Sequence, residues 1–165
     1  MKLAFRSSWR PLRETMVFER LFHPKLRMTL PDKRELLGVR GAITVWMINA
    51  RSGALIGEVY GVPIADALRD VDEGTPDLTP YRGRRAMYVY STAVLTRYQR
   101  HGLGRILKAY HLGRIAQAGY EIVIGHARFP ASCALNVSFG ARLGARHPNW
   151  YGTGELYRFY ELRLK

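Results

Sequence analysis

The sequence predicts a single domain built on a mixed β-sheet with helices, of the α/β or α+β class. The chain has 165 residues, which is the length of one domain, and 47% of them are hydrophobic, which is enough for a core. In its second half, β-rich runs alternate with segments of helical periodicity. Because no Gly/Ser/Pro-rich linker or internal repeat divides the chain, we expect residues 1–165 to form one domain.

The first half predicts two helices followed by a β-hairpin. Residues 11–22 have the apolar spacing of an amphipathic helix that begins at Pro11, and residues 32–38 form a second short helix. Two β-rich runs follow at 42–50 and 54–62, and Arg51-Ser52-Gly53 joins them as a hairpin turn. We expect residues 63–86, which contain three prolines, to form a loop with one helical turn at about 65–69.

The second half predicts a regular order of strands and helices. We expect a strand, a helix, a strand, a helix and two final strands, at 87–95, 102–118, 120–126, 131–143, 145–151 and 156–164. In the first of these helices, Leu103, Ile106, Leu107 and Tyr110 have the i, i+3, i+4, i+7 spacing of a buried face. This order of elements favours a mixed sheet that ends in antiparallel strands.

Composition excludes several classes of protein. Cys133 is the only cysteine, so an intrachain disulfide framework and a cysteine-built zinc cluster are excluded, and we expect a reducing, cytoplasmic location. No apolar run approaches the ~18 residues that a membrane-spanning helix needs, so we expect no membrane partner. The first residues become basic again too soon to form the apolar part of a signal peptide.

The chain is strongly basic, with 26 Lys and Arg against 13 Asp and Glu and a net charge of +13. Residues 1–40 carry ten of the cations and four acids, and no acid lies between Asp77 and Glu121. Such a distribution favours an anionic ligand or partner, although it is also consistent with a charge that serves only solubility.

Residues 94–105 are the most informative segment. A predicted strand runs into a short basic loop with Gly102 and Gly104, and a helix begins there at once. Because the first turn of a helix has unpaired N–H groups and a partial positive charge, this arrangement is typical of phosphate binding. It is neither a P-loop nor a dinucleotide fingerprint, since Arg105-Ile106 and Leu107 replace residues that those motifs require. The glycines could instead serve only close packing.

The run Gln99-x-x-Gly102-x-Gly104 resembles the signature Gln/Arg-x-x-Gly-x-Gly/Ala of the GCN5-related N-acetyltransferase (GNAT) family. The resemblance extends from about residue 42 to the end, with its core at 87–145, whereas residues 1–40 match only in layout, as a helical region on the acceptor side. It implies a mostly antiparallel twisted sheet of six to seven strands with about four helices, in which a splayed strand pair forms the cofactor cleft.

The resemblance also implies a function. Members of the family transfer an acetyl group from acetyl-CoA to an amine without a metal. On this chain, the implied cofactor-binding residues are Val94, Leu95, Gln99, Arg100, His101, Gly102, Leu103, Gly104, Arg105 and Asn136. The backbone of Val94 and Leu95 would pair with pantetheine, and the loop amides would hold the pyrophosphate.

The candidates for the catalytic base lie on the predicted strands. The family's base lies on the strand before the loop, where this chain has Tyr88 and Tyr90. These two share a face and can order water or simply pack, since an ordinary tyrosine pKa of ~10 does not suit a base. Glu58 is the next candidate, against the alternative of an exposed carboxylate on an edge strand. His126 could shuttle protons or be structural.

The chain also departs from the family at the proton donor. Gly140 stands where the family often has the tyrosine that protonates the leaving thiolate. Tyr151 or Tyr157 could replace it, and Cys133 is expected to be a small buried residue rather than a nucleophile.

Two functional hypotheses follow. The first is an acetyl-CoA-dependent N-acetyltransferase for a primary amine on an anionic acceptor, such as a nucleic acid, an aminoacyl-tRNA or an acidic protein. The alternative is a catalytically idle GNAT-fold module that binds CoA, nucleic acid or a protein partner. Transfer of a longer acyl group and a homodimeric assembly also stay open.

Overall fold

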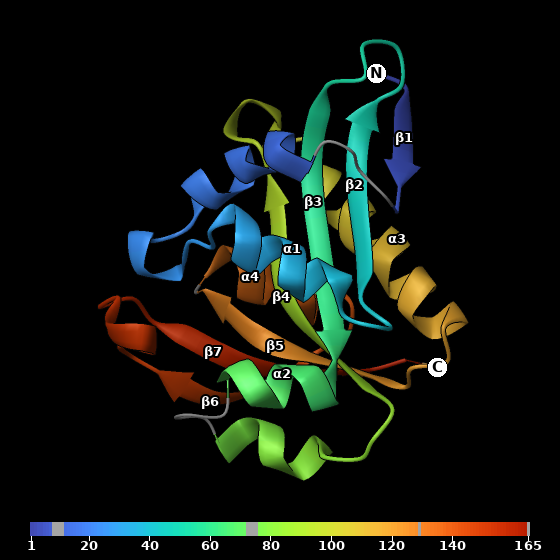
Figure 1. The fold of residues 1–165 in the computed structure, drawn as a ribbon. Helices are drawn as coiled ribbons and strands as arrows, with labels where there is room; N and C mark the ends of the chain where they lie inside the picture. The colour runs from blue at the N-terminus through green and yellow to red at the C-terminus, as the bar shows by residue number, and fades with distance from the viewer. Residues whose placement is uncertain (8–11, 72–75, 129, 165) are drawn as a thin grey trace.

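A computed structural model describes residues 1–7, 12–71, 76–128 and 130–164. Its centre is a seven-stranded sheet in the order β1-β2-β3-β4-β5-β7-β6 (Figure 1). All neighbouring strands are antiparallel except β4 and β5, which are parallel. The mixed, mostly antiparallel sheet expected from the sequence is thus confirmed.

The strands agree closely with the sequence prediction in the middle of the chain. Their bounds are β1 Leu3–Arg6, β2 Ile43–Asn49, β3 Leu55–Pro63, β4 Ala86–Val94, β5 Ile122–Arg128, β6 Arg142–His147 and β7 Tyr157–Arg163. β1 was not expected, because four residues between basic neighbours carry little periodicity. It pairs with the outer edge of β2, where Leu3 lies opposite Asn49.

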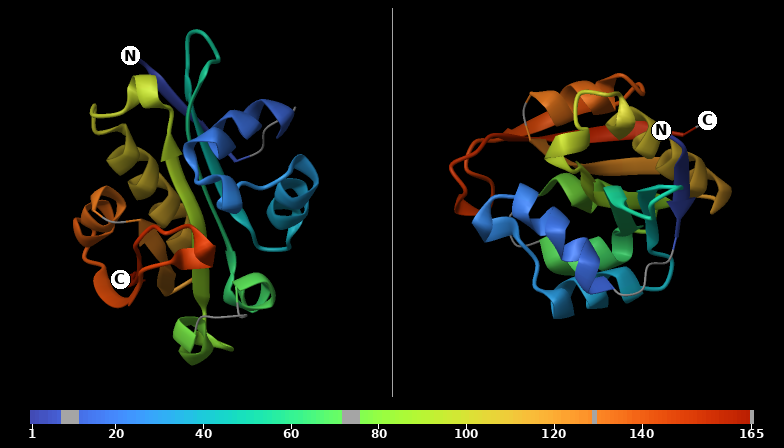
Figure 2. Two further views of the ribbon diagram at one scale, coloured as in Figure 1. Left: turned by 90° about the vertical axis from the view of Figure 1, so that its left-hand side faces the viewer. Right: turned by 90° about the horizontal axis from the view of Figure 1, so that it is seen from above.

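Helices cover both faces of the sheet. The α-helices are α1 Leu30–Gly38, α2 Ile64–Val71, α3 Leu103–Gln117 and α4 Ala131–Val137, and the longest 3₁₀ helices are η1 Leu12–Leu21 and η3 Pro76–Tyr81. α3 packs on β2, β3 and β4, and α4 packs on β5 and β7. Figure 2 shows α3 on one side of the strands and the early helices, η1 and α1, on the other.

Three sequence predictions need correction. Residues 63–86 are not mainly a loop, because α2 and η3 bury Ile64, Ala67 and Leu78 in the core, and this tertiary packing outweighs the prolines. The predicted helix at 11–22 is a 3₁₀ helix that begins at Leu12 in the structure, and Pro11 lies outside the described residues.

The third correction concerns the helix predicted at 131–143, which ends at Val137. Gly140 has φ +91°, its N–H donates to the carbonyl of Val137, and the N–H of Ala141 donates to the carbonyl of Asn136. This pair of bonds around a left-handed glycine is a Schellman motif, which terminates a helix. As a result β6 begins at Arg142, and the segment Leu143-Gly144-Ala145 lies on a strand.

The buried face of α3 also differs from the prediction. Ile106 and Tyr110 are exposed by 44% and 40%, whereas Leu107 is fully buried. Two polar residues, Lys108 and His111, occupy the buried face together with Leu103, Leu112 and Ile115. The apolar spacing predicted the wrong face because two polar side chains, Lys108 and His111, lie on the face of α3 that is buried.

β4 and β5 form hydrogen-bonded pairs only from Ala86–Ile122 to Tyr88–Ile124 and then separate. At the point of separation, a Cβ on Gly125 would lie 2.7 Å from the carbonyl oxygen of Val89, so only glycine fits there. Beyond it, the register of β4 against β3 shifts, because Tyr60 pairs with Ser91 and Gly61 with Val89. Tyr90 is the extra residue of this β-bulge.

No helix among the described residues is long and apolar enough to cross a membrane.

Candidate active site

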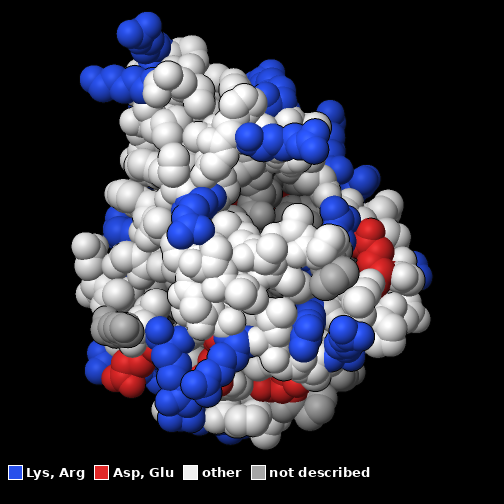
Figure 3. All heavy atoms as spheres, turned by 180° about the vertical axis from the view of Figure 1, so that it is seen from behind, with Lys and Arg blue, Asp and Glu red and all other residues white. Residues whose placement is uncertain are grey.

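A cavity of about 890 Å³ occupies the gap between the separated strands. The last seven residues of β4 line it, together with the start of α3, the start of α4 and parts of η1 and the segment after it. Figure 3 shows a hollow on the face that carries α3 and α4, with Lys and Arg side chains spread around it. The sheet thus gives the cavity two sides, which we call the loop side (α3 and α4) and the aromatic side (α1, α2 and η3).

The loop side is built on the N-terminus of α3. Gly102 is the N-cap and has φ +73°, and Arg100 has φ +64°. A residue other than glycine rarely adopts this left-handed conformation, and such strain is typical of functional loops. The loop turns the first N–H groups of α3, which have no partner within a helix, toward the cavity that Gly102 and Gly104 line. This is the arrangement that binds phosphate groups.

Side chains hold the loop in place. The Gln99 side-chain Nε2 donates to the carbonyl of Val94 at 2.8 Å, which ties the loop to the end of β4. The His101 Nδ1 lies 2.7 Å from the carbonyl oxygen of Gln99. The Arg105 guanidinium donates to the Ser138 hydroxyl at 2.8 Å and thereby links α3 to the end of α4. The polar side chains of the loop therefore brace its backbone, and the first amides of α3 are left to meet a ligand.

Two buried polar atoms on the cavity wall have no hydrogen-bond partner among the described residues: the hydroxyl of Ser91 and Oδ1 of Asn136. The Asn136 Nδ2 donates to the carbonyl of Ser132 at 2.8 Å, so its oxygen is the free end. Because buried polar atoms are rarely left unpaired, these two fit a ligand with amide and carbonyl groups of its own.

The structure brings most of the sequence-predicted cofactor residues to the cavity. All of them line it except Leu95 and His101. Leu95 donates its N–H to the carbonyl of Ile56 on β3, and its side chain packs beside Phe18 and Trp46, on the opposite side from the gap. The expected backbone pairing with pantetheine is therefore available from Val94 and the residues before it, but not from Leu95.

The aromatic side of the cavity contains Tyr88 and Tyr90, whose rings meet edge to face at 4.8 Å. Both pack against the same core cluster, as the alternation along the strand predicts. His126 on β5 stacks on Trp150 with ring centroids 4.0 Å apart. This side is therefore walled by aromatic rings, with a single imidazole among them.

A chain of hydrogen bonds joins Tyr88 to two residues that sequence reasoning missed. The Tyr88 hydroxyl lies 2.9 Å from His126 Nδ1, and His126 Nε2 lies 3.3 Å from Oδ2 of Asp77. The same oxygen of Asp77 lies 2.6 Å from Nε2 of His147. Because Asp77 and His147 are 70 residues apart, in η3 and β6, no local pattern in the sequence could have associated them.

The protonation of this chain follows from its partners. A carboxylate only accepts hydrogen bonds, so His126 carries its proton on Nε2 and accepts from the Tyr88 hydroxyl at Nδ1. Burial lowers the pKa of His126 to about 4, although Asp77 opposes that shift. Burial also raises the pKa of Tyr88 well above its ordinary value. At neutral pH the imidazole is therefore neutral and its Nδ1 is unprotonated, while the low pKa makes it a weak proton acceptor.

Asp77, His126 and His147 are also the one group of described residues whose ligand atoms lie close enough together to hold a metal ion, within 4.8 Å of one another. The hydrogen bonds just described account for their approach without an ion. Cys133 is buried, its Sγ points to the carbonyl of Ala127 at 3.5 Å, and burial raises the pKa of its thiol, which does not suit a nucleophile.

Glu58 is not the exposed edge carboxylate that was the alternative to a catalytic role, because it is fully buried. One of its oxygens accepts from Lys33 Nζ at 2.7 Å and the other from Trp46 Nε1 at 2.7 Å. It is absent from the described residues that line the cavity. Lys33 also contacts Glu19 at 2.9 Å, so this ion triad fastens α1 and η1 to the sheet. The position of Glu58 therefore favours a structural role over that of a base.

The open sheet with a bulged β4, a β4–β5 pair that separates, and a glycine-containing loop at the start of α3 give the chain the fold of solved acetyltransferases of the GNAT superfamily.

Comparison with solved structures supports this assignment. The ribosomal-protein-S18-alanine N-acetyltransferase from Escherichia coli has a TM-score of 0.75 at 17% identity and covers 99% of this chain and 95% of its own. A phosphinothricin acetyltransferase from Sinorhizobium meliloti, solved in complex with AcCoA, has a TM-score of 0.71 at 17% identity and covers 99% and 89%. The ribosomal-protein-alanine N-acetyltransferase from Brucella melitensis has 0.70 at 16% and covers 98% and 99%.

No family model and no curated protein matches the sequence. The likeness is therefore one of fold.

Proposed function

We propose that the protein is an N-acetyltransferase that transfers an acetyl group directly from acetyl-CoA to a primary amine. The observation that carries this proposal is the union, in one cavity, of the α3 N-terminus, the free edge of β4 and a buried imidazole on β5. The first feature suits a pyrophosphate, the second an extended amide chain, and the third a proton.

The residues of the loop side fit acetyl-CoA. The backbone N–H groups of residues 102–104 and the guanidinium of Arg105 would bind the pyrophosphate. The edge of β4 that β5 leaves free, from Val89 to Val94, offers backbone groups to pantetheine, and Asn136 Oδ1 offers it an acceptor. When bound, acetyl-CoA would supply the activated acyl group, and the protein would orient it without forming a covalent bond to it.

The aromatic side supplies the proton acceptor. An amine attacks only in its neutral form, so the site must remove a proton from the ammonium before or during attack. Tyr88 can receive this proton on its oxygen while passing its own to Nδ1 of neutral His126. Asp77 then stabilises the imidazolium through Nε2. This relay gives Tyr88 a role that its own high pKa would not allow, because His126 is the group that finally holds the proton.

The residues around the aromatic side support an acceptor that carries negative charge. Lys25, Arg27 and Arg128 line the cavity there. The acids of this lining are engaged within the protein, Glu19 with Lys33 and Asp32 with the Thr29 side chain. We therefore propose an amine on an anionic molecule, such as an aminoacyl-tRNA, another nucleic acid or an acidic protein.

Calorimetry with acetyl-CoA tests the cofactor assignment, and Kd above the millimolar range would overturn it. Thiol release from acetyl-CoA in the presence of a panel of amines, with and without tRNA, then tests the acceptor. Turnover of spermidine or free amino acids without turnover of any anionic acceptor would contradict the acceptor class. Tight binding of acetyl-CoA without turnover of any amine would favour the alternative of a catalytically idle binding module.

A further inference from the structure

A lysine lies in the core beside the cavity. Lys108 on α3 is 1% exposed, and its Nζ lies 3.2 Å from the Tyr160 hydroxyl and 5.2 Å from the centre of the same ring. Among the described residues it forms no ion pair with a carboxylate. Burial without a counter-charge lowers the pKa of Lys108 to about 7. Because such a residue destabilises the fold, its position calls for a functional explanation.

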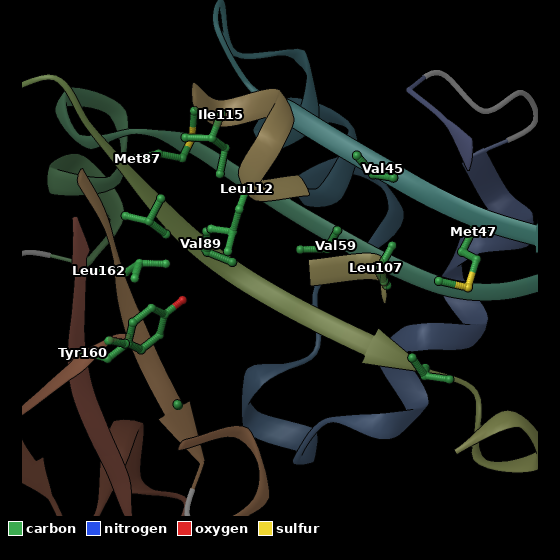
Figure 4. Close-up of a cluster of buried hydrophobic side chains, with 14 of the residues drawn as sticks. Val45, Met47, Val59, Met87, Val89, Leu107, Leu112, Ile115, Tyr160 and Leu162 are labelled. Carbon is green, nitrogen blue, oxygen red and sulfur yellow. The ribbon is translucent and has the colours of Figure 1, made fainter. Parts of the chain in front are cut away.

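Its partner, Tyr160, lies where β4 and β5 separate. Tyr160 on β7 pairs with Gly125 on β5, and a Cβ on Gly125 would lie 2.9 Å from its hydroxyl. Tyr160 is a wall residue of the cavity and belongs to the core cluster under α3. In Figure 4 the hydroxyl of Tyr160 points from β7 toward Val89 on β4. Tyr160 therefore reaches the wall of the cavity from the loop side, and Lys108 lies behind it.

Tyr88 and His126 line the same cavity from the aromatic side. Tyr88, Trp150 and Tyr157 belong to the cluster on that face of the sheet, and Tyr160 belongs to the other. A thioester that enters along β4 from the pyrophosphate loop would have its sulfur on the loop side and its carbonyl carbon facing the amine. Tyr160 is thus a tyrosine of the cavity wall on the loop side, whereas Tyr157, suggested by the sequence, belongs to the cluster on the opposite face.

We propose that Tyr160, with Lys108 behind it, is the proton donor to the thiolate of CoA, in the place that Gly140 leaves empty; the proposal rests on the proposed function. The amine nitrogen bonds to the carbonyl carbon and the carbon–sulfur bond breaks. The sulfur keeps that electron pair and takes the hydroxyl proton of Tyr160. Tyr160 regains a proton from the Lys108 ammonium, and Lys108 takes one from solvent before the next turnover. The nitrogen loses two protons as the ammonium becomes an amide, one through His126 and one after the new bond forms, and both pass to solvent, so that one proton is released in each cycle.

The surroundings leave Lys108 able to change its charge. His111, one turn along α3, is the other titratable group near it; burial lowers the pKa of His111 to about 3, so it is neutral, and it contacts the carbonyl of Ile43 at 2.9 Å. The residues that β3 and β4 contribute to the surrounding cluster are apolar, with Val59, Met87 and Val89 among them. The Tyr160 hydroxyl is therefore the polar contact through which Lys108 can act.

The test compares binding of CoA with binding of desulfo-CoA, which lacks the thiol, by calorimetry at several pH values near and above neutrality. A donor pair aimed at the sulfur lowers the pKa of the bound thiol, so CoA should bind more tightly than desulfo-CoA by about tenfold for each unit of that shift. In Tyr160→Phe and Lys108→Met this preference should disappear, so that CoA and desulfo-CoA bind each variant with the same Kd. Tyr110→Phe, an exposed tyrosine on α3, is the matched control and should keep the preference.

The possible outcomes separate the two proposals. If the unmodified protein shows no preference for CoA, or if both variants retain it, the donor pair is overturned although acetyl-CoA binds. If neither CoA nor acetyl-CoA binds the unmodified protein, the proposed function itself fails, and this inference with it. Unfolding in urea shows that each variant is folded, and the loss of an unpaired buried charge should make Lys108→Met more stable, not less.

Discussion

The Tyr88 hydroxyl lies 2.9 Å from Nδ1 of His126, although Tyr88 pairs in the sheet with Ile124. His126 is two residues further along β5, so it shares a face with Ile124 and lies beyond the last hydrogen-bonded pair of the two strands. The imidazole thus crosses the gap just where β4 and β5 begin to separate. A proton relay at this place stands at the entrance to the space between the strands, which is where the proposed acetyl transfer needs it.

Replacing His126 by Ala should lower kcat/KM for acetyl transfer by about 10²- to 10⁴-fold, because the relay loses its final proton acceptor. Asp77→Asn should also lower it, since the amide no longer stabilises the imidazolium. His147→Gln should lower it less, because His147 contacts the same oxygen of Asp77 but lies one bond further from Tyr88 than His126 does. The assay is thiol release with an amine that the panel identifies. Full activity in His126→Ala would show that the relay does not carry the proton.

Gly104→Leu should weaken acetyl-CoA binding by at least about tenfold, which is 1.4 kcal/mol. The side chain would project into the cavity at the start of α3, while its Cβ would meet Val94 and Leu135 at ordinary distances of 3.9 and 4.0 Å. Calorimetry measures the loss, and circular dichroism checks that the fold is retained. Gly113→Ala, at an exposed site on the same helix, should bind normally and gain about 0.5–1 kcal/mol of stability. Normal binding by Gly104→Leu would place the pyrophosphate elsewhere.

Lys33→Met should lower the free energy of unfolding by about 3–5 kcal/mol, because it leaves two buried carboxylates, Glu19 and Glu58, without a cation. Denaturant unfolding measures the change. Adding Glu58→Gln to the Lys33→Met variant removes one of the stranded charges and should restore part of the loss. If the double variant is less stable than Lys33→Met, the charge of Glu58 is not the source of the cost.

Lys108→Met should stabilise the protein, and most strongly at low pH. The pKa of Lys108 is about 7 in the folded state, against an ordinary value of about 10.4 in the unfolded chain. Between these values the unfolded chain binds more protons, so the stability of the unmodified protein rises with pH. Below about pH 7 both states are protonated and the cost of the buried charge is complete. The gain from Lys108→Met should therefore be largest below pH 7 and shrink toward pH 10, in urea unfolding at each pH. A gain independent of pH would mean that packing, not charge, is its origin.

Local sequence was sufficient for the features that depend on local chemistry. The turn Arg51-Ser52-Gly53 joins β2 and β3, and Gly102 with Gly104 begins α3, as expected. These positions need particular backbone angles or close approach, and glycine marks both in the sequence. The helix predicted beyond Val137 failed for a related reason, because Gly140 belongs to the cap and not to the helix.

What the sequence could not reveal depends on distant contacts. Glu58 seemed exposed because its strand looked like an edge, whereas β3 lies between β2 and β4, and α1 and η1 cover the face where Glu58 meets Lys33. The partners of His126 come from η3 and β6, which meet only in three dimensions. The buried face of α3 was misassigned because Lys108 and His111 are polar, and a hydropathy pattern assigns such residues to solvent.

Among the residues that the structure describes, the three pairs that join β4 to β5 are the only ladder between two blocks of sheet, one formed by β1 to β4 and the other by β5 to β7. The first block ends at Val94 and the second begins at Ile122, so each comes from a continuous stretch of chain. The proposed pantetheine chain, bound in the gap, would pair with the edge of β4 and join the two blocks. Amide hydrogen exchange along the open edges of β4 and β5 should then slow on binding, because the ligand would restrict the movement of the two blocks relative to each other.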